Sequence, residues 1–73
     1  MKPESLIRIA ERQLGRKNVR VDDRFVEDLG AESMDLVNLM VAVEEETGIF
    51  IPEEKIPELR TLKELLEYIH FQE

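Results

Sequence analysis

The chain contains no cysteine, no tryptophan and only one histidine. Without cysteine there is neither a disulfide framework nor a thiolate nucleophile. A serine hydrolase would need a base, and the only histidine, His70, belongs to the last apolar segment, where we expect an exposed helix end. The chain also lacks a G-x-S-x-G elbow and the EF-hand pattern of acids. We therefore expect no enzyme and no metal site.

The chain also lacks an excess of positive charge and any apolar run of membrane-spanning length. It shows no apolar signal segment, so we expect a cytoplasmic protein that does not insert into membranes. A net charge of −7 opposes binding to nucleic acids and favours partners with basic surfaces. The charge is uneven: residues 1–24 hold seven Lys/Arg and four Asp/Glu, whereas residues 25–73 hold three and thirteen.

The chain has 73 residues, 42% of them hydrophobic, which predicts one small globular domain over residues 1–73. Apolar residues recur at helical spacing over residues 3–14, and Gly15 suits the end of that helix. Residues 16–32 show no sustained period. We interpret them as a long loop attached to the core by its scattered apolar residues, which are Val19, Val21, Phe25 and Leu29.

The periodic pattern returns over residues 33–47, where a second helix is expected to begin with Ser33 as its N-cap. Residues 49–51 are apolar but have no partner strand, so we expect a buried connector. A short helix over about residues 52–59 follows, interrupted by Pro57. The run Thr61-Leu62-Lys63-Glu64 is a capping box that opens the last helix. The predicted fold is all-α: a small bundle of three main helices plus one short helix.

The most informative stretch is Asp28-Leu29-Gly30-Ala31-Glu32-Ser33-Met34-Asp35, where the long loop meets the second helix. The free N–H groups of a helix start favour an anion, so a phosphate ester on Ser33 would be stabilised there. Physical chemistry alone leaves a simpler alternative open, in which Ser33 only caps the helix.

This stretch resembles the phosphopantetheine attachment motif of acyl carrier proteins, which typically have D-L-G-A-D-S-L-D. The resemblance continues through V-x-L-x-x-x-x-E-E-E and Ile51-Pro52-Glu53-Glu54 and covers essentially the whole chain. It implies a covalent 4'-phosphopantetheine on Ser33, attached from coenzyme A by a phosphopantetheinyl transferase. The chain departs from the pattern at Glu32 and Met34, at Asn38 in place of an acid, and at Thr47 in place of an aromatic. These departures indicate a specialised carrier rather than a housekeeping one.

The resemblance also implies a docking face on the second helix for acyl-transferring and chain-modifying enzymes with basic surfaces. The candidate residues form an apolar row flanked by acids. They are Glu32, Met34, Asp35, Val37, Val41, Glu44 and Glu45. Acids of this kind steer a basic partner and set its orientation. Two alternative interpretations remain: the apolar row only widens the core, and the acids are only a solvated run of charge.

The predicted carrier is a monomer that holds acyl intermediates as thioesters for fatty acid, polyketide or related lipid biosynthesis. Met34, Leu36, Met40, Val43 and Ile56 are candidates to line a space for the acyl chain. The closest alternative is a carrier of aminoacyl or peptidyl groups, which tends to have G-G-x-S and less acid than this chain. The sequence leaves the identity of the cargo, the pathway and the partner enzymes open.

Overall fold

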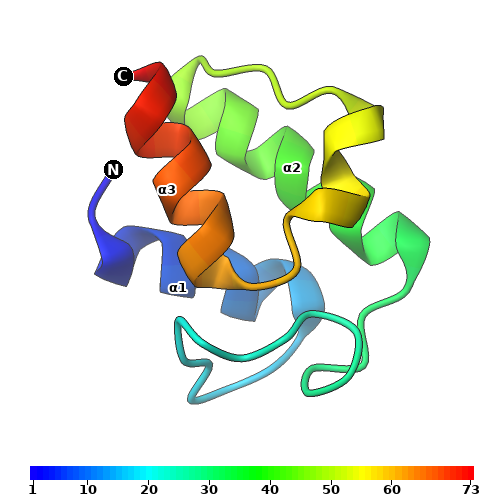
Figure 1. Ribbon diagram of the computed structural model, residues 1–73. Helices are drawn as coiled ribbons and strands as arrows, with labels where there is room; N and C mark the ends of the chain where they lie inside the picture. Colours follow the sequence, from blue (N-terminus) through cyan, green and yellow to red (C-terminus); the bar gives the residue numbers. More distant parts are fainter.

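The fold consists of three α-helices and one 3-10 helix, in a computed structural model that describes residues 1–73. The α-helices are α1 (Pro3–Leu14), α2 (Ser33–Thr47) and α3 (Leu62–Gln72), and the 3-10 helix η1 spans Glu53–Glu58. Figure 1 shows α1 along the bottom, α2 above and behind it, and α3 crossing in front. This arrangement confirms the predicted all-α bundle of three main helices and one short one.

The core is built entirely from apolar side chains. Sixteen residues are buried, and none of them is polar or charged. Each helix contributes the stripe that its periodicity predicts: Leu6, Ile9 and Ala10 from α1, Leu39, Met40 and Val43 from α2, Leu62, Leu65 and Ile69 from α3. The stripes meet because each helix has only one apolar face to remove from water.

The long loop between α1 and α2 is attached to the core as predicted. Val19, Phe25 and Leu29 are buried and Val21 is half-buried. The backbone of the loop also bonds to the start of α3. Phe25 N–H donates to the carbonyl of Arg60 at 2.9 Å, and Lys63 N–H donates to the carbonyl of Val21 at 2.8 Å. The loop is thus held to both the core and α3.

The start of α3 is fixed by the predicted capping box. The Glu64 N–H donates to Thr61 Oγ1 at 3.1 Å, and the Thr61 N–H donates to Glu64 Oε1 at 3.1 Å. Glu64 Oε1 also accepts the Arg60 N–H at 2.8 Å. Three backbone donors at the end of the preceding segment and the start of the helix are therefore satisfied locally.

The connector after α2 differs from the prediction of a buried segment. Ile51 is buried and Ile49 is half-buried, but Phe50 is 66% exposed. The segment has no regular structure, and in an extended chain successive side chains point to opposite sides. The middle of three consecutive apolar residues therefore leaves the core. Pro57 lies inside η1, which remains a 3-10 helix.

Candidate functional site

The turn that precedes the attachment motif is held by Asp28 and Arg24. The Asp28 carboxylate accepts the Arg24 backbone N–H at 2.8 Å, and its two oxygens accept Arg24 Nε and Nη2 at 3.0 Å each. The side-chain hydrogen bond from Arg24 lowers the pKa of Asp28 to about 2. The first acid of the motif therefore has a local structural task, which is to close the turn over residues 24–29.

From this turn the chain is led to Ser33 by an alternation of buried and exposed residues. Leu29 and Ala31 are buried on either side of exposed Gly30. Gly30 has a φ of 67°, in the left-handed region where a residue with a Cβ is strained. Its N–H bonds to the carbonyl of Val26, and the Ala31 N–H bonds to that of Phe25. These contacts fix the direction in which the chain enters α2.

The N-cap of α2 is Glu32 and not Ser33, which corrects the sequence-based prediction. Glu32 has an extended backbone, and its N–H donates to Asp35 Oδ2 at 2.9 Å. A carboxylate can reach back in this way only from the third residue of the helix. If Ser33 were the cap, that third residue would be Leu36, which has no acceptor. Asp35 thus sets the start of the helix at Ser33.

Ser33 occupies the first turn of α2 with an exposed side chain whose hydroxyl makes no hydrogen bond within the chain. Beside it lies an open hollow of about 340 Å³ between α2 and η1, lined by Ser33, Leu36, Val37, Glu53, Ile56 and Pro57. A free hydroxyl, the unpaired N–H groups of a helix start and a partly apolar groove alongside fit a phosphodiester with an extended arm.

The structure places the residues expected to line a space for an acyl chain in different environments. Leu36 and Ile56 border the hollow next to Ser33. Met40 and Val43 are buried in the core, and Met34 is 66% exposed. The sequence could not separate these roles because a small core needs the same residue types. Val37, Glu53 and Pro57 were not anticipated as lining residues.

The predicted docking residues lie along one side of α2. In the apolar row, Met34 and Val41 are exposed, at 66% and 49%, and Val37 is half-buried. Glu32, Glu44 and Glu45 are exposed and Asp35 is half-buried. None of these four acids forms an ion pair within the chain. Their charges are therefore available to a partner.

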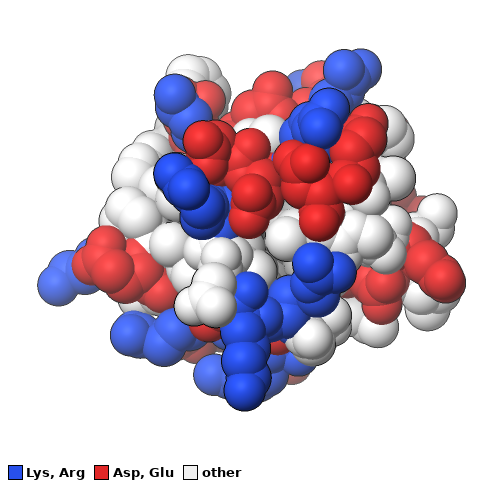
Figure 2. Space-filling model, turned by 90° about the horizontal axis from the view of Figure 1, so that it is seen from below, with Lys and Arg blue, Asp and Glu red and all other residues white.

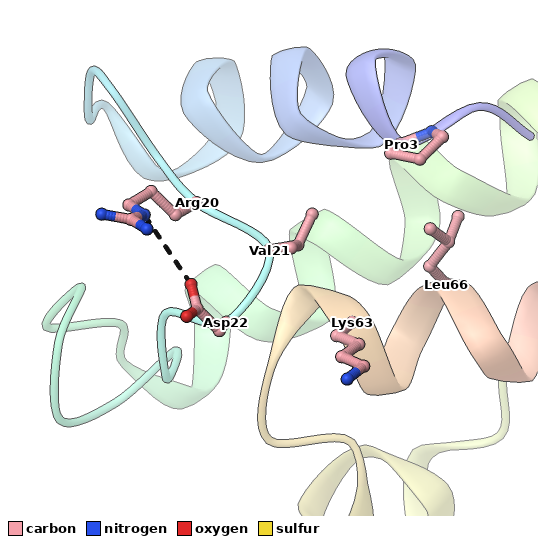
Figure 3. A pocket seen from close by; sticks show the side chains of 6 residues that line it. All are labelled: Pro3, Arg20, Val21, Asp22, Lys63 and Leu66. Atoms are coloured by element: carbon pink, nitrogen blue, oxygen red, sulfur yellow. Dashed lines mark ion pairs between the residues drawn. The ribbon is translucent and has the colours of Figure 1, made fainter.

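A second hollow lies on another side of the molecule, away from Ser33. Figure 3 shows this hollow of about 430 Å³ between the start of α1, the loop and α3, where Arg20 and Asp22 pair at 3.8 Å. The other side chains that line it are Pro3, Val21, Lys63 and Leu66.

His70 is exposed, as expected, and its Nε2 lies 2.8 Å from the carbonyl oxygen of Met1. No group of three acids or imidazoles is placed to bind a metal, and no helix has the length and apolarity of a membrane span.

The comparisons with known proteins agree with this geometry. The family model of the phosphopantetheine attachment site matches residues 4–69. Acyl carrier proteins of Rickettsia canadensis (strain McKiel) and Rickettsia rickettsii (strain Iowa) are each 43% identical over 51 residues, or 70% of this chain. The chain spans 59% of the length of these relatives. A solved structure assigned as an acyl carrier protein of Mycobacterium tuberculosis shares the fold, with a TM-score of 0.88 over 97% of both chains at 21% identity.

The match over nearly the whole bundle, with an exposed serine at the start of α2, places the chain in the phosphopantetheine attachment site family. The curated relatives given above are named acyl carrier proteins. 4'-Phosphopantetheine is the group that a domain of this family bears covalently.

Proposed function

We propose that the protein carries acyl groups on a 4'-phosphopantetheine arm attached to Ser33. The observation that supports this most directly is the position of Ser33. It is exposed, its hydroxyl makes no hydrogen bond within the chain, and it lies in the first turn of α2 inside the segment that resembles the attachment motif. When bound, the arm supplies a terminal thiol that holds the acyl group as a thioester.

The residues around Ser33 prepare the site rather than react. The turn closed by Asp28 and the left-handed Gly30 hold the chain so that the serine projects from the end of α2. The N–H groups of the first helical turn stabilise a nearby phosphate by roughly 0.3–1 kcal/mol at an exposed position. Leu36 and Ile56 offer the arm an apolar groove.

The docking face for partner enzymes is part of this proposal. It comprises the apolar row of Met34, Val37 and Val41 with its flanking acids. Reversing the charge of Glu44 is expected to slow association with a basic partner and to weaken its salt dependence. Glu67→Lys on α3 is the matched control. A larger effect of Glu67→Lys would show that the docking face lies on another helix.

The setting of the function is also proposed. The resemblance and the named relatives favour a monomeric cytoplasmic carrier that exchanges acyl groups with enzymes of fatty acid, polyketide or related lipid synthesis. Its departures from the usual motif favour a dedicated pathway. Loading of the arm by an acyltransferase, compared with loading by an aminoacyl-adenylating enzyme, separates this proposal from a carrier of aminoacyl or peptidyl groups.

The experiment that tests the attachment site is intact-mass measurement after incubation with coenzyme A and a phosphopantetheinyl transferase. The mass is expected to rise by one phosphopantetheine unit in the wild type and not in Ser33→Ala. The only other serine is Ser5, half-buried in α1, so Ser5→Ala is the matched control and should still be modified. Modification of Ser33→Ala would place the arm on another residue.

A further inference from the structure

An exposed aromatic side chain lies next to the docking row, outside the residues that the sequence suggests. Phe50, in the connector after α2, is 66% exposed. A ring with this exposure offers a large apolar surface that a docking protein can remove from water. The other exposed phenylalanine, Phe71, lies in the last turn of α3 and is 85% exposed.

Phe50 shares a small hollow with the docking row. The hollow has a volume of about 100 Å³, and its walls include Val37, Val41, Glu44, Phe50 and Glu53. A cavity of about 150 Å³ accommodates benzene, so 100 Å³ suits one aliphatic side chain and not a larger ligand. The walls are apolar, and two carboxylates lie at the edge.

This hollow is close enough to Ser33 to belong to the same contact. Val41 lies eight residues after Ser33 on α2, which corresponds to about 12 Å along the helix axis. A standard protein contact covers about 800 Å² on each partner, and the whole molecule measures 27 × 25 × 18 Å. A contact of this size centred on α2 can therefore include both Ser33 and Phe50.

We propose that Phe50, Val41 and Val37 form a socket for one apolar side chain of the enzymes that dock on α2. Glu44 and Glu53 at its edge pair with Lys or Arg residues that flank that side chain on the partner. Aromatic residues in such positions contribute disproportionately to binding, because they remove a large rigid surface from water. The partner chemistry follows from the walls of the socket: apolar in the centre and basic at the rim.

This inference rests on the proposed function. Measuring docking in a chain with Ser33→Ala allows the socket to be tested separately from attachment of the arm. A chain with Ser33→Ala cannot receive the arm at the proposed site, so its dissociation constant for a phosphopantetheinyl transferase reports docking alone. We would measure that constant with and without Phe50→Ala, and with Phe71→Ala as the matched exposed control. Thermal melts of the three chains should coincide within about 2 °C, since exposed side chains contribute little to folding.

Phe50→Ala is expected to raise the dissociation constant about tenfold and Phe71→Ala to leave it within twofold. An unchanged constant for Phe50→Ala, or no measurable docking of the Ser33→Ala chain, would overturn the socket. Faster thioester hydrolysis in the loaded Phe50→Ala protein, with docking unchanged, would assign the hollow to the cargo and also overturn it. Docking that depends on Phe50, together with a wild-type mass that does not rise after incubation with coenzyme A and the transferase, would instead contradict the proposed function alone.

Discussion

At the scale of single residues, Asp28 shows how an acid of the attachment motif acts without touching the cargo. Its carboxylate makes three hydrogen bonds to Arg24, one of them to the backbone, and thereby closes the turn before Gly30. The same contact raises the pKa of Arg24. The motif thus contains one residue that is proposed to bear the arm and another that shapes the approach to it.

Removing the Asp28 carboxylate is expected to lower the melting temperature in a pH-dependent manner. The pKa of Asp28 is about 2 in the fold, below its usual 3.8. A lowered pKa stabilises the fold fully above the unfolded value and loses that effect as the pH falls through the folded value. The difference in melting temperature between wild type and Asp28→Ala should be constant above about pH 5 and shrink toward pH 2.

The matched control for this experiment is Asp22→Ala. Asp22 pairs with Arg20 at 3.8 Å, and both side chains are highly exposed. Exposed pairs of this kind contribute little. An equal effect of the two substitutions, or a difference that does not change with pH, would contradict the role assigned to the Asp28 turn.

The start of α2 shows what could be predicted at this scale and what could not. The serine proposed to bear the arm is identifiable because its neighbours in the chain resemble a motif. Its structural role was predicted wrongly, because serine is a preferred N-cap in isolation. Asp35 carried the missing information. Its side chain can reach back to a cap three residues earlier, which is Glu32 and not Ser33.

At the scale of elements, the predicted bounds of α1 and α2 agree with the structure, and the capping box fixes the start of α3. Helical periodicity and glycine C-caps are local signals, so they can be recognised without knowledge of the tertiary fold. The connector after α2 was predicted less well, because burial of Phe50 depends on which side of an extended chain faces the core. Ala31 was not among the apolar loop residues expected to reach the core, but it is buried.

Thr61→Ala is expected to destabilise the protein by about 1 kcal/mol, the usual cost of losing an N-cap side chain. It leaves the Glu64 N–H without its acceptor at the point where α3 begins. For a domain of this size that corresponds to a fall in melting temperature of roughly 4–8 °C. Thermal unfolding followed by circular dichroism measures it. Glu67→Ala, on the exposed side of the same helix, should change the melting temperature by much less.

At the scale of the whole molecule, the charges are divided between the two parts of the chain. Residues 25–73 hold thirteen acids against three bases, while residues 1–24 are basic overall. The face in Figure 2 carries a concentration of Asp and Glu in its upper part, flanked by Lys and Arg side chains, and a group of Lys and Arg at its lower centre. Only four ion pairs form within the chain, so much of the acidic charge remains unpaired.

Added salt or magnesium is therefore expected to raise the melting temperature at neutral pH. Unpaired acids on a small domain repel one another, and the unfolded chain separates the same charges further. Screening weakens that repulsion over distances near the Debye length, about 8 Å at physiological ionic strength. Thermal melts in increasing sodium chloride and in millimolar magnesium chloride test this. A melting temperature that falls on adding magnesium would show that the few ion pairs outweigh the repulsion.

The backbone bonds between the loop and the start of α3 have a consequence for how the protein matures during synthesis. Phe25 bonds to Arg60, and Val21 bonds to Lys63, across nearly half of the chain. A nascent chain that has not yet exposed Arg60 and Lys63 to solvent lacks these two bonds to the loop, although α1 and α2 are complete. Ser33 would then project from an unanchored segment, and a transferase should modify stalled chains ending before Arg60 more slowly than chains of 73 residues. The segment that contains Arg60 and Lys63 is thus expected to influence when the arm can be attached.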